Sequence, residues 1–261
     1  MKDKVIVITG ASAGIGAALA ETVAKRGARG IVLAARRLPE LQAVAAKLGD
    51  AALVVPSDVT RRADNDLIRD RALATFGRID VWVNNAGRGI SRLVSQLTDA
   101  DIDDMMTVNL KSVLYGIQTV LPHFKEQKQG HLVTVSSGLS RLPLAPQRSA
   151  YSASKAAVNL LMASLRIELR DAFPQIHTTT VIPGVVATEF GTNALHGGVD
   201  NRRLPNAQPV EEVAAVIADA IEHPRAEVYT RAQMLELVAR YFAADDVSVI
   251  ERQPPFMPPV R

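Results

Sequence analysis

The order of apolar runs along the chain is the feature that most limits its fold. Short runs rich in β-branched residues alternate with longer segments whose apolar residues recur at helical spacing. The first run begins at Val5 and stops at Gly10, as a buried parallel strand would. Strands that alternate with helices form right-handed βαβ crossovers. We therefore predict an α/β fold with a single doubly wound parallel sheet of about seven strands flanked by helices.

The expected elements follow from these patterns. The predicted strands cover residues 5–9, 31–35, 52–55, 79–84, 131–136, 176–182 and 226–230. The predicted helices cover residues 14–26, 38–48, 60–76, about 99–125, 149–172, 210–222 and a last segment to about 242. Thr98 is the expected cap of the fourth helix, and Pro122 should mark or disturb its end.

No linker or repeat divides residues 1–250, so we expect one domain there. The Pro-rich residues 251–261 are expected to form a C-terminal tail, either loose or packed on a neighbouring subunit.

Composition and charge exclude several classes of protein. The chain has no cysteine, which rules out disulfides, thiolate nucleophiles and cysteine-ligated metals. The formal net charge of +3 has no clustered block, so a nucleic-acid partner is not expected. No apolar run is long enough for a membrane span, and the five histidines form no helical metal pair. We expect a soluble, cytoplasmic protein without a metal.

A glycine-rich segment, Thr9–Gly16, joins the first predicted strand to the first helix with the spacing Gly-x-x-x-Gly-x-Gly. Glycines let the backbone approach a pyrophosphate, and the helix N-terminus offers free N–H groups and a positive dipole end. A tight turn without a ligand is the alternative. Position at the first βα turn favours a dinucleotide site. Its expected contacts are Gly10, Ser12, Gly14, Ile15 and Gly16.

Two arginines, Arg36 and Arg37, follow the second predicted strand, where an NAD site usually has an acidic residue for the ribose 2′-hydroxyl. Arginine suits a 2′-phosphate through charge-assisted hydrogen bonds, and Ser12 could add a hydroxyl. The two arginines could instead be the solvated start of a helix, although positive charge is mildly unfavourable there. We predict NADP(H) as the cofactor.

Tyr151 and Lys155 are four residues apart in a predicted helix and therefore share one face. A lysine ammonium near a phenol stabilises the phenolate and is expected to lower the pKa of Tyr151 from its reference near 10. A general acid or base works best with a pKa close to the working pH. Alone, the pair is also what an ordinary amphipathic helix would contain.

Further motifs accompany this pair, in the order in which a known family has them. They are Asp58-Val59, Asn84-Asn85-Ala86-Gly87, Asn109, Ser136-Ser137, Tyr151-x-x-x-Lys155 and Pro183-Gly184-Val185-Val186-Ala187-Thr188, after the glycine-rich segment. From Val5 to about Tyr229 the chain resembles the short-chain dehydrogenase/reductase family. The resemblance implies a Rossmann fold and an oxidoreductase that interconverts a carbonyl and an alcohol.

The same resemblance implies roles for individual residues. Tyr151 would be the general acid/base, Lys155 would also hold the nicotinamide ribose, and Ser137 would hydrogen-bond the substrate oxygen. Asn109 would anchor a water in a proton relay with Lys155. The other implied cofactor contacts are Asp58, Val59, Asn85, Ala86, Gly87, Pro183, Gly184, Val186 and Thr188.

The serine departs from the family's spacing. The family places it thirteen residues before the tyrosine, where this chain has Gly138, and Ser137 lies fourteen before. An insertion of one residue between Ser140 and Ser149 would explain the difference. Ser136 and Ser140 are the other candidates.

Three loops at the carboxyl ends of the strands, 87–96, 138–148 and 189–206, should select the substrate. The last contains Phe190, Leu195 and His196 and could close as a lid. Leu139, Leu142, Leu144 and Leu195 suggest either an apolar pocket or ordinary loop packing. We predict a hydrophobic ketone or alcohol as the substrate, with a non-catalytic NADP(H) sensor or scaffold as the alternative function.

The two long predicted helices resemble those that pair in homodimers and homotetramers of the family. Gly116 and the small residues of the helix from Ser149 would permit close helix contact. The same residues could simply pack against the sheet.

Overall fold

The predicted parallel sheet is present and contains seven strands in the order β3-β2-β1-β4-β5-β6-β7. A computed structural model describes residues 1–256 of the chain. The strands are β1 Val5–Thr9, β2 Gly30–Ala35, β3 Ala52–Pro56, β4 Val81–Asn84, β5 Gly130–Val135, β6 Ile176–Ile182 and β7 Glu227–Tyr229. All six neighbouring pairs are parallel, so the predicted doubly wound architecture is confirmed.

The helices agree with the sequence pattern to within a few residues at most ends. They are α1 Gly14–Lys25, α2 Leu38–Ala45, α3 Arg62–Phe76, α4 Asp99–Met106, α5 Ser112–Glu126, α6 Ser149–Leu169, α7 Val210–Glu222, α8 Ala232–Phe242 and α9 Val247–Ile250. α2 stops at Ala45, earlier than predicted, and α9 was not predicted. None of the helices in residues 1–256 combines the length and the apolar character that crossing a bilayer requires.

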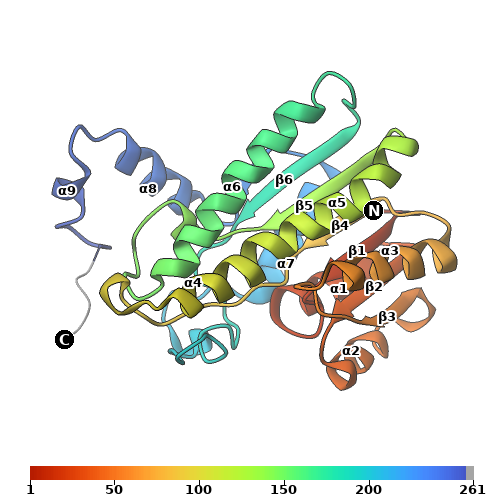
Figure 1. Ribbon diagram of the computed structural model, residues 1–261, viewed down its shortest axis with the longest axis horizontal. Coiled ribbons are helices and arrows are strands. Elements are labelled where there is room, and N and C mark those ends of the chain that lie inside the picture. Colours follow the sequence, from red (N-terminus) through yellow and green to blue (C-terminus); the bar gives the residue numbers. More distant parts are fainter. Residues whose placement is uncertain (257–261) are drawn as a thin grey trace.

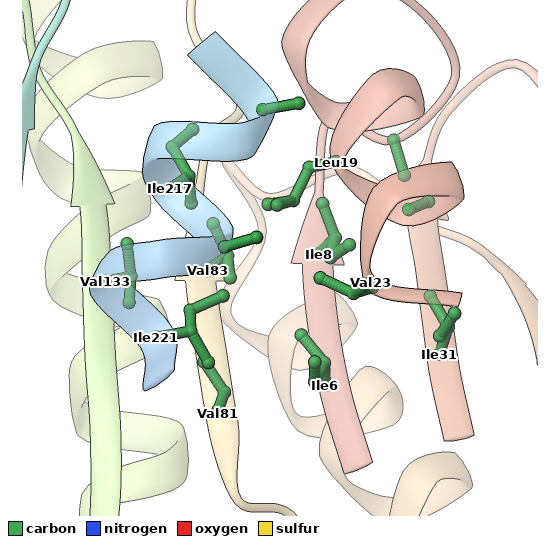
Figure 2. Packing of buried hydrophobic residues seen from close by; sticks show 14 of the residues in the cluster. Ile6, Ile8, Leu19, Val23, Ile31, Val81, Val83, Val133, Ile217 and Ile221 are labelled. Atoms are coloured by element: carbon green, nitrogen blue, oxygen red, sulfur yellow. The ribbon is translucent and has the colours of Figure 1, made fainter. Parts of the chain in front are cut away.

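One face of the sheet is covered by α1 and α7. Alternate strand residues point to this side, so that Ile6 and Ile8 of β1 pack with Leu19 of α1 and Ile217 of α7 (Figure 2). All four side chains are fully buried. The cluster also joins β2, β4 and β5, and it is what fixes α1 over the end of β1.

The opposite face is covered by α3, α5 and α6, of which α5 and α6 run side by side across it (Figure 1). Val7, between Ile6 and Ile8, points to this side. Gly116 of α5 lies against β4, because a Cβ there would come within 2.7 Å of the Trp82 indole nitrogen. Gly116 therefore allows α5 to pack closely on the sheet, which is the second of the two roles expected for it.

The helix predicted over residues 99–125 is interrupted by a π-helical segment, Thr107–Lys111. The Thr98 hydroxyl accepts a hydrogen bond from the Asp101 backbone N–H at 3.3 Å, as predicted for a cap. Pro122 lies inside α5, which ends one turn later at Glu126. π-segments of this kind often lie at functional sites, and Asn109 is at the centre of this one.

The first part of the Pro-rich tail packs on its own chain. Phe256 is buried and its ring stacks on that of Tyr241 in α8, with centroids 5.5 Å apart. The same cluster contains Leu142 and Val238. Phe256 is therefore packed on its own chain, whereas residues 251–255 are exposed, and residues 257–261 of the predicted tail lie outside the described residues.

The order of strands reverses between β1 and β4. β1 continues to β2 on one side, and β4 continues to β5 on the other. In doubly wound sheets, loops diverge at such a switch point and leave a crevice at the carboxyl ends of the strands. The glycine-rich segment follows β1 and Asn85 follows β4, so both predicted cofactor segments meet at this edge.

The packing of α1 on the sheet yields a stability prediction. Leu19→Ala leaves a cavity under α1 and should lower the free energy of unfolding by about 2–5 kcal/mol. The matched change Leu67→Ala removes a 43% exposed leucine from α3 and should alter it by about 0.5 kcal/mol or less. Urea denaturation followed by circular dichroism measures both, and equal losses would contradict the assigned core.

Candidate active site

The glycine-rich segment makes a close backbone crossing with the loop after β4. Gly10 has φ +66°, and a Cβ at this position would lie 2.9 Å from the Cα of Ala86. The Asn85 side chain donates a hydrogen bond to the Thr9 carbonyl at 2.9 Å, and the Thr9 hydroxyl accepts one from the Asn85 backbone at 3.0 Å. Glycine is needed at position 10 because both the backbone angle and the crossing exclude a side chain.

The N-terminus of α1 faces this crossing. No capping side chain accepts hydrogen bonds from the backbone N–H groups of its first turn. Its N-cap residue is Ala13, which has no capping group, and the first turn contains no acidic residue. A helix start of this kind suits an anion, because free N–H groups and the positive dipole end point toward it. Gly14 and Ile15 open the helix, and Gly14 lies next to Thr188 of the loop after β6. These residues fit the pyrophosphate of a dinucleotide.

Arg36 and Arg37 lie exposed at the end of β2, beside the glycine-rich segment. Arg37 donates a hydrogen bond to the Ser12 hydroxyl at 3.1 Å and lies 3.4 Å from the Glu40 carboxylate. The three residues that the sequence analysis grouped around a 2′-phosphate, Ser12, Arg36 and Arg37, thus occur at one edge of the site.

Asp58 follows β3 at the same edge and is held by its own turn. Its carboxylate accepts hydrogen bonds from the Thr60 hydroxyl at 2.7 Å and backbone N–H at 3.0 Å. Burial alone would raise the pKa of Asp58, but these bonds and the charges of Arg36 and Arg61 lower it overall. Val59 is bound at its carbonyl by Asn65. An ionised Asp58 is therefore available to hydrogen-bond donors.

Tyr151 and Lys155 lie together near the start of α6, with exposed fractions of 6% and 4%. The Lys155 nitrogen is 6.0 Å from the centre of the Tyr151 ring and donates a hydrogen bond to the Val135 carbonyl of β5 at 2.9 Å. A Cβ at Gly87 would lie 3.5 Å from that nitrogen and 3.1 Å from the Asn109 amide oxygen. Four predicted site residues, from the loop after β4, the π-helical segment and α6, are thus brought together.

Burial shifts the pKa of both members of the pair against their charged forms. It lowers the pKa of Lys155 to about 8. It raises the pKa of Tyr151, and the Ser137 hydroxyl and the positive charge of Arg148 offset only part of this. The prediction that Lys155 lowers the pKa of Tyr151 is therefore wrong for this structure, because the desolvation of a buried phenolate outweighs the nearby charges. Tyr151 is a protonated donor at neutral pH.

The three candidate serines have different partners. The Ser136 hydroxyl donates to the Asn159 side chain at 2.6 Å, and Ser140 accepts from Asn159 at 2.7 Å. Ser137 caps the short turn Gly138–Ser140, where its hydroxyl accepts a hydrogen bond from the Leu139 N–H at 3.2 Å. Of the three serines, it is Ser137 whose side chain interacts with the Tyr151 phenol and lowers its pKa. This arrangement favours Ser137.

Asn109 is fully buried in the π-segment. Its amide oxygen accepts from the Arg88 N–H at 2.9 Å, and its amide nitrogen donates to the Arg88 carbonyl at 3.0 Å and to Ser154 at 3.1 Å. The side chain therefore fixes the loop after β4 to α6. Both hydrogens of the amide nitrogen are engaged, whereas the amide oxygen keeps a second lone pair.

The loop after β6 forms the remaining wall. The Pro183 carbonyl accepts a hydrogen bond from the Gly138 N–H at 2.7 Å, which ties Gly184 and its neighbours to the loop that carries Ser137. Val186 is buried and bridged to Gln208, and the Thr188 backbone N–H donates to the Val186 carbonyl at 2.8 Å. Val186 and Thr188 thus stand at the carboxyl end of β6, opposite Gly14.

The predicted lid, residues 189–206, lies over Tyr151. The Phe190 ring packs on the Tyr151 ring with centroids 5.3 Å apart, and Leu195 is bridged to Ile90. His196 is bound to the Asp101 carboxylate at 2.6 Å. This bond, together with those from Thr98 and Arg92, holds the pKa of Asp101 well below its usual range. Asp101 is thus an anchor for the lid as well as part of a helix start.

The four loop leucines divide between two clusters. Leu139 and Leu195 pack around Tyr151 with Ile90 and Phe190. Leu142 and Leu144 pack instead against α8 and the start of the tail. The apolar surface at the site is therefore smaller than the one that the sequence suggested, since two of its four members are structural.

Two features of the site were missed from the sequence. The link between Asp101 and His196 joins residues 95 positions apart, and no local pattern signals it. The second feature is the positive charge of Arg148, which lowers the pKa of Tyr151. Arg148 lies three residues before Tyr151, and this spacing could have indicated the contact.

Known proteins are similar to this chain in sequence. The family model for short chain dehydrogenases matches residues 4–197. An uncharacterized oxidoreductase of Listeria innocua is 36% identical over 232 residues, 86% of this chain and 92% of that protein.

Solved structures have the same fold. A short-chain dehydrogenase/reductase from Burkholderia phymatum, in complex with NAD, has a TM-score of 0.84 at 26% identity and covers 100% of this chain and 98% of its own. One from Burkholderia cenocepacia, in complex with NADP, has a TM-score of 0.80 at 27% identity, with 99% of both chains covered. The chain belongs to the short-chain dehydrogenase family of oxidoreductases.

Proposed function

We propose that this protein is an NADP(H)-dependent oxidoreductase that interconverts a carbonyl compound and the corresponding alcohol, with Tyr151 as general acid/base. One observation carries the proposal: Tyr151 and Lys155 are buried side by side, next to Gly87 and Asn109, at the sheet edge where the glycine-rich segment also lies. A proton donor therefore stands beside the place where a dinucleotide would be held.

When bound, NADPH supplies a hydride, which together with one proton converts the carbonyl to an alcohol and leaves NADP⁺. Tyr151 holds that proton, because burial raises the pKa of its phenol. Ser137, whose hydroxyl interacts with Tyr151, would hydrogen-bond the carbonyl oxygen. Lys155, fixed by the Val135 carbonyl, supplies positive charge near the phenol as the proton leaves. Asn109 keeps the loop after β4 in register with α6.

The choice of NADP(H) rests on the end of β2. Arg36, Arg37 and Ser12 offer two cations and a hydroxyl where an acidic residue would favour NAD(H). Related structures contain either NAD or NADP, so the preference depends on these residues and not on the fold. An enzyme of this design accepts apolar ketones, since Phe190, Leu139 and Leu195 surround Tyr151.

A non-catalytic NADP(H) sensor or scaffold is the second candidate. Such a protein would need the cofactor cradle but not a proton donor, whereas here Tyr151, Lys155, Ser137 and Asn109 are all in one place. Tight NADPH binding without turnover on any carbonyl would favour the sensor.

Removing the phenolic hydroxyl tests the chemistry. Tyr151→Phe should lower kcat for carbonyl reduction by about 10²–10⁴-fold, because the general acid is lost. NADPH binding, measured by fluorescence titration, should change less than about threefold. Absorbance of the reduced nicotinamide follows turnover. Wild-type rates in the phenylalanine variant would refute the assignment of the acid.

The cofactor preference can be tested on the arginines. Arg36→Ala combined with Arg37→Ala should raise KM for NADPH by about 10–150-fold or more, since one charge-assisted hydrogen bond alone accounts for this range, with little change for NADH. Arg71→Ala removes an exposed arginine from the middle of α3 and serves as the matched control. A wild type that prefers NADH would overturn the reading of Arg36 and Arg37.

We also propose that the protein assembles as a homodimer or homotetramer through α6. Leu160 and Ile167 are 71% and 66% exposed on this helix and, seven residues apart, lie on one face of it. Sedimentation should give a multiple of the 28.1 kDa chain, and Leu160→Asp with Ile167→Asp should give the single chain. A wild-type monomer at working concentration would remove the proposal.

A further inference from the structure

Arg148 is a half-buried cation in the candidate active site whose charge has no carboxylate partner among residues 1–256. It precedes α6, and its guanidinium donates one hydrogen bond, to the Ile90 carbonyl at 3.1 Å. Two arginines of the neighbouring loop differ in this respect. Arg88 lies 3.5 Å from Asp104, and Arg92 lies 3.0 Å from Asp101.

The guanidinium of Arg148 lies between the loop after β4 and the lid. A Cβ at Gly89 would be 3.1 Å from one terminal nitrogen and 2.9 Å from the Phe190 ring. A Cβ at Gly198 would be 2.8 Å from the other terminal nitrogen. Since Phe190 packs on Tyr151, the cation, the lid and the proton donor are neighbours.

A purely structural role does not explain a positive charge here. Burial lowers the pKa of Arg148, which means that the charge is held in a poorly solvated place. The start of α6 is also the positive end of its dipole, where a cation is unfavourable. A neutral donor would suffice for the hydrogen bond to the Ile90 carbonyl. This bond therefore does not explain why position 148 has a positively charged side chain.

A carboxylate is the natural partner of such a group. The planar guanidinium presents parallel donors that match a carboxylate, and the pair is strong where water is partly excluded. Arg148 is three residues before Tyr151, one helical turn away, so the anion would lie a few bonds from the reacting carbonyl. Phe190, Leu139 and Leu195 offer apolar contacts to the rest of the molecule.

We propose that Arg148 binds a carboxylate of the substrate, so that the enzyme acts on oxo acids and hydroxy acids with an apolar body. The assignment rests on the carbonyl reductase function proposed above and narrows its substrate class. Arg148 then contributes chiefly to substrate binding, while its charge also lowers the pKa of Tyr151.

The test compares each oxo acid with its own methyl ester. The panel contains 2-, 3- and 4-oxo acids of roughly five to eight carbons, assayed with NADPH in the wild type, Arg148→Gln, Arg148→Lys and Arg203→Gln. Arg203 is an exposed arginine of the lid segment. Arg203→Gln therefore measures how much the loss of one positive charge near the site changes the rate without removing Arg148.

The wild type should have a kcat/KM for at least one acid about tenfold or more above that for its ester. Arg148→Gln should lower the kcat/KM for that acid by about 10–150-fold, mainly through KM, and the value for the ester by a smaller factor, mainly through kcat, because the ester loses only the effect of the charge on Tyr151. Arg148→Lys should retain part of the preference for the acid over its ester, and Arg203→Gln should retain all of this preference.

Two results would overturn the proposal while the proposed function stands. In one, the wild type reduces the esters as well as the acids. In the other, Arg148→Gln loses activity on both alike, which would make the residue a support for the lid or for Tyr151. If the wild type binds NADPH but reduces neither acids nor esters nor neutral ketones, the reductase function itself fails, and the substrate assignment fails with it.

Discussion

The close approach of two backbone segments, one after β1 and one after β4, is the constraint on which the site depends. Gly10 crosses against Ala86, and the Asn85 side chain holds the crossing to the Thr9 carbonyl. Because α1 starts directly after the crossing, its free N–H groups face the crevice at the switch point of the sheet. The buried cluster beneath α1 holds this helix on the sheet. The hydrophobic core therefore also positions the glycine-rich segment.

The second constraint is the burial of Tyr151 and Lys155. Burial disfavours the charge of each, raising the pKa of the phenol and lowering that of the amine to about 8. The structure compensates by giving the Lys155 nitrogen a carbonyl partner and by placing Ser137 beside the phenol. A tyrosine that keeps its proton at neutral pH is suited to the proposed reduction, in which it would give that proton to the carbonyl oxygen.

The architecture could be predicted because it depends on local signals, whereas the roles of most site residues came from the resemblance to the family and stay predictions. Strand and helix periods, the glycine spacing and the cap at Thr98 are read within a few residues. Contacts between distant segments are not, which is why the tie between His196 and Asp101 and the packing of Phe256 on Tyr241 were missed. The pKa of Tyr151 was predicted in the wrong direction for the same reason, because the residues that bury it, such as Ile90, Met105 and Phe190, come from distant segments.

A crystal structure of the protein with NADP⁺ tests the central claim most directly, namely that the glycine-rich crossing and Tyr151 form one site. We expect the pyrophosphate at the N-terminus of α1, the 2′-phosphate at Arg36 and Arg37, and the nicotinamide ring beside Tyr151 and Lys155. A dinucleotide bound elsewhere, or bound at α1 with its nicotinamide directed away from Tyr151, would contradict it.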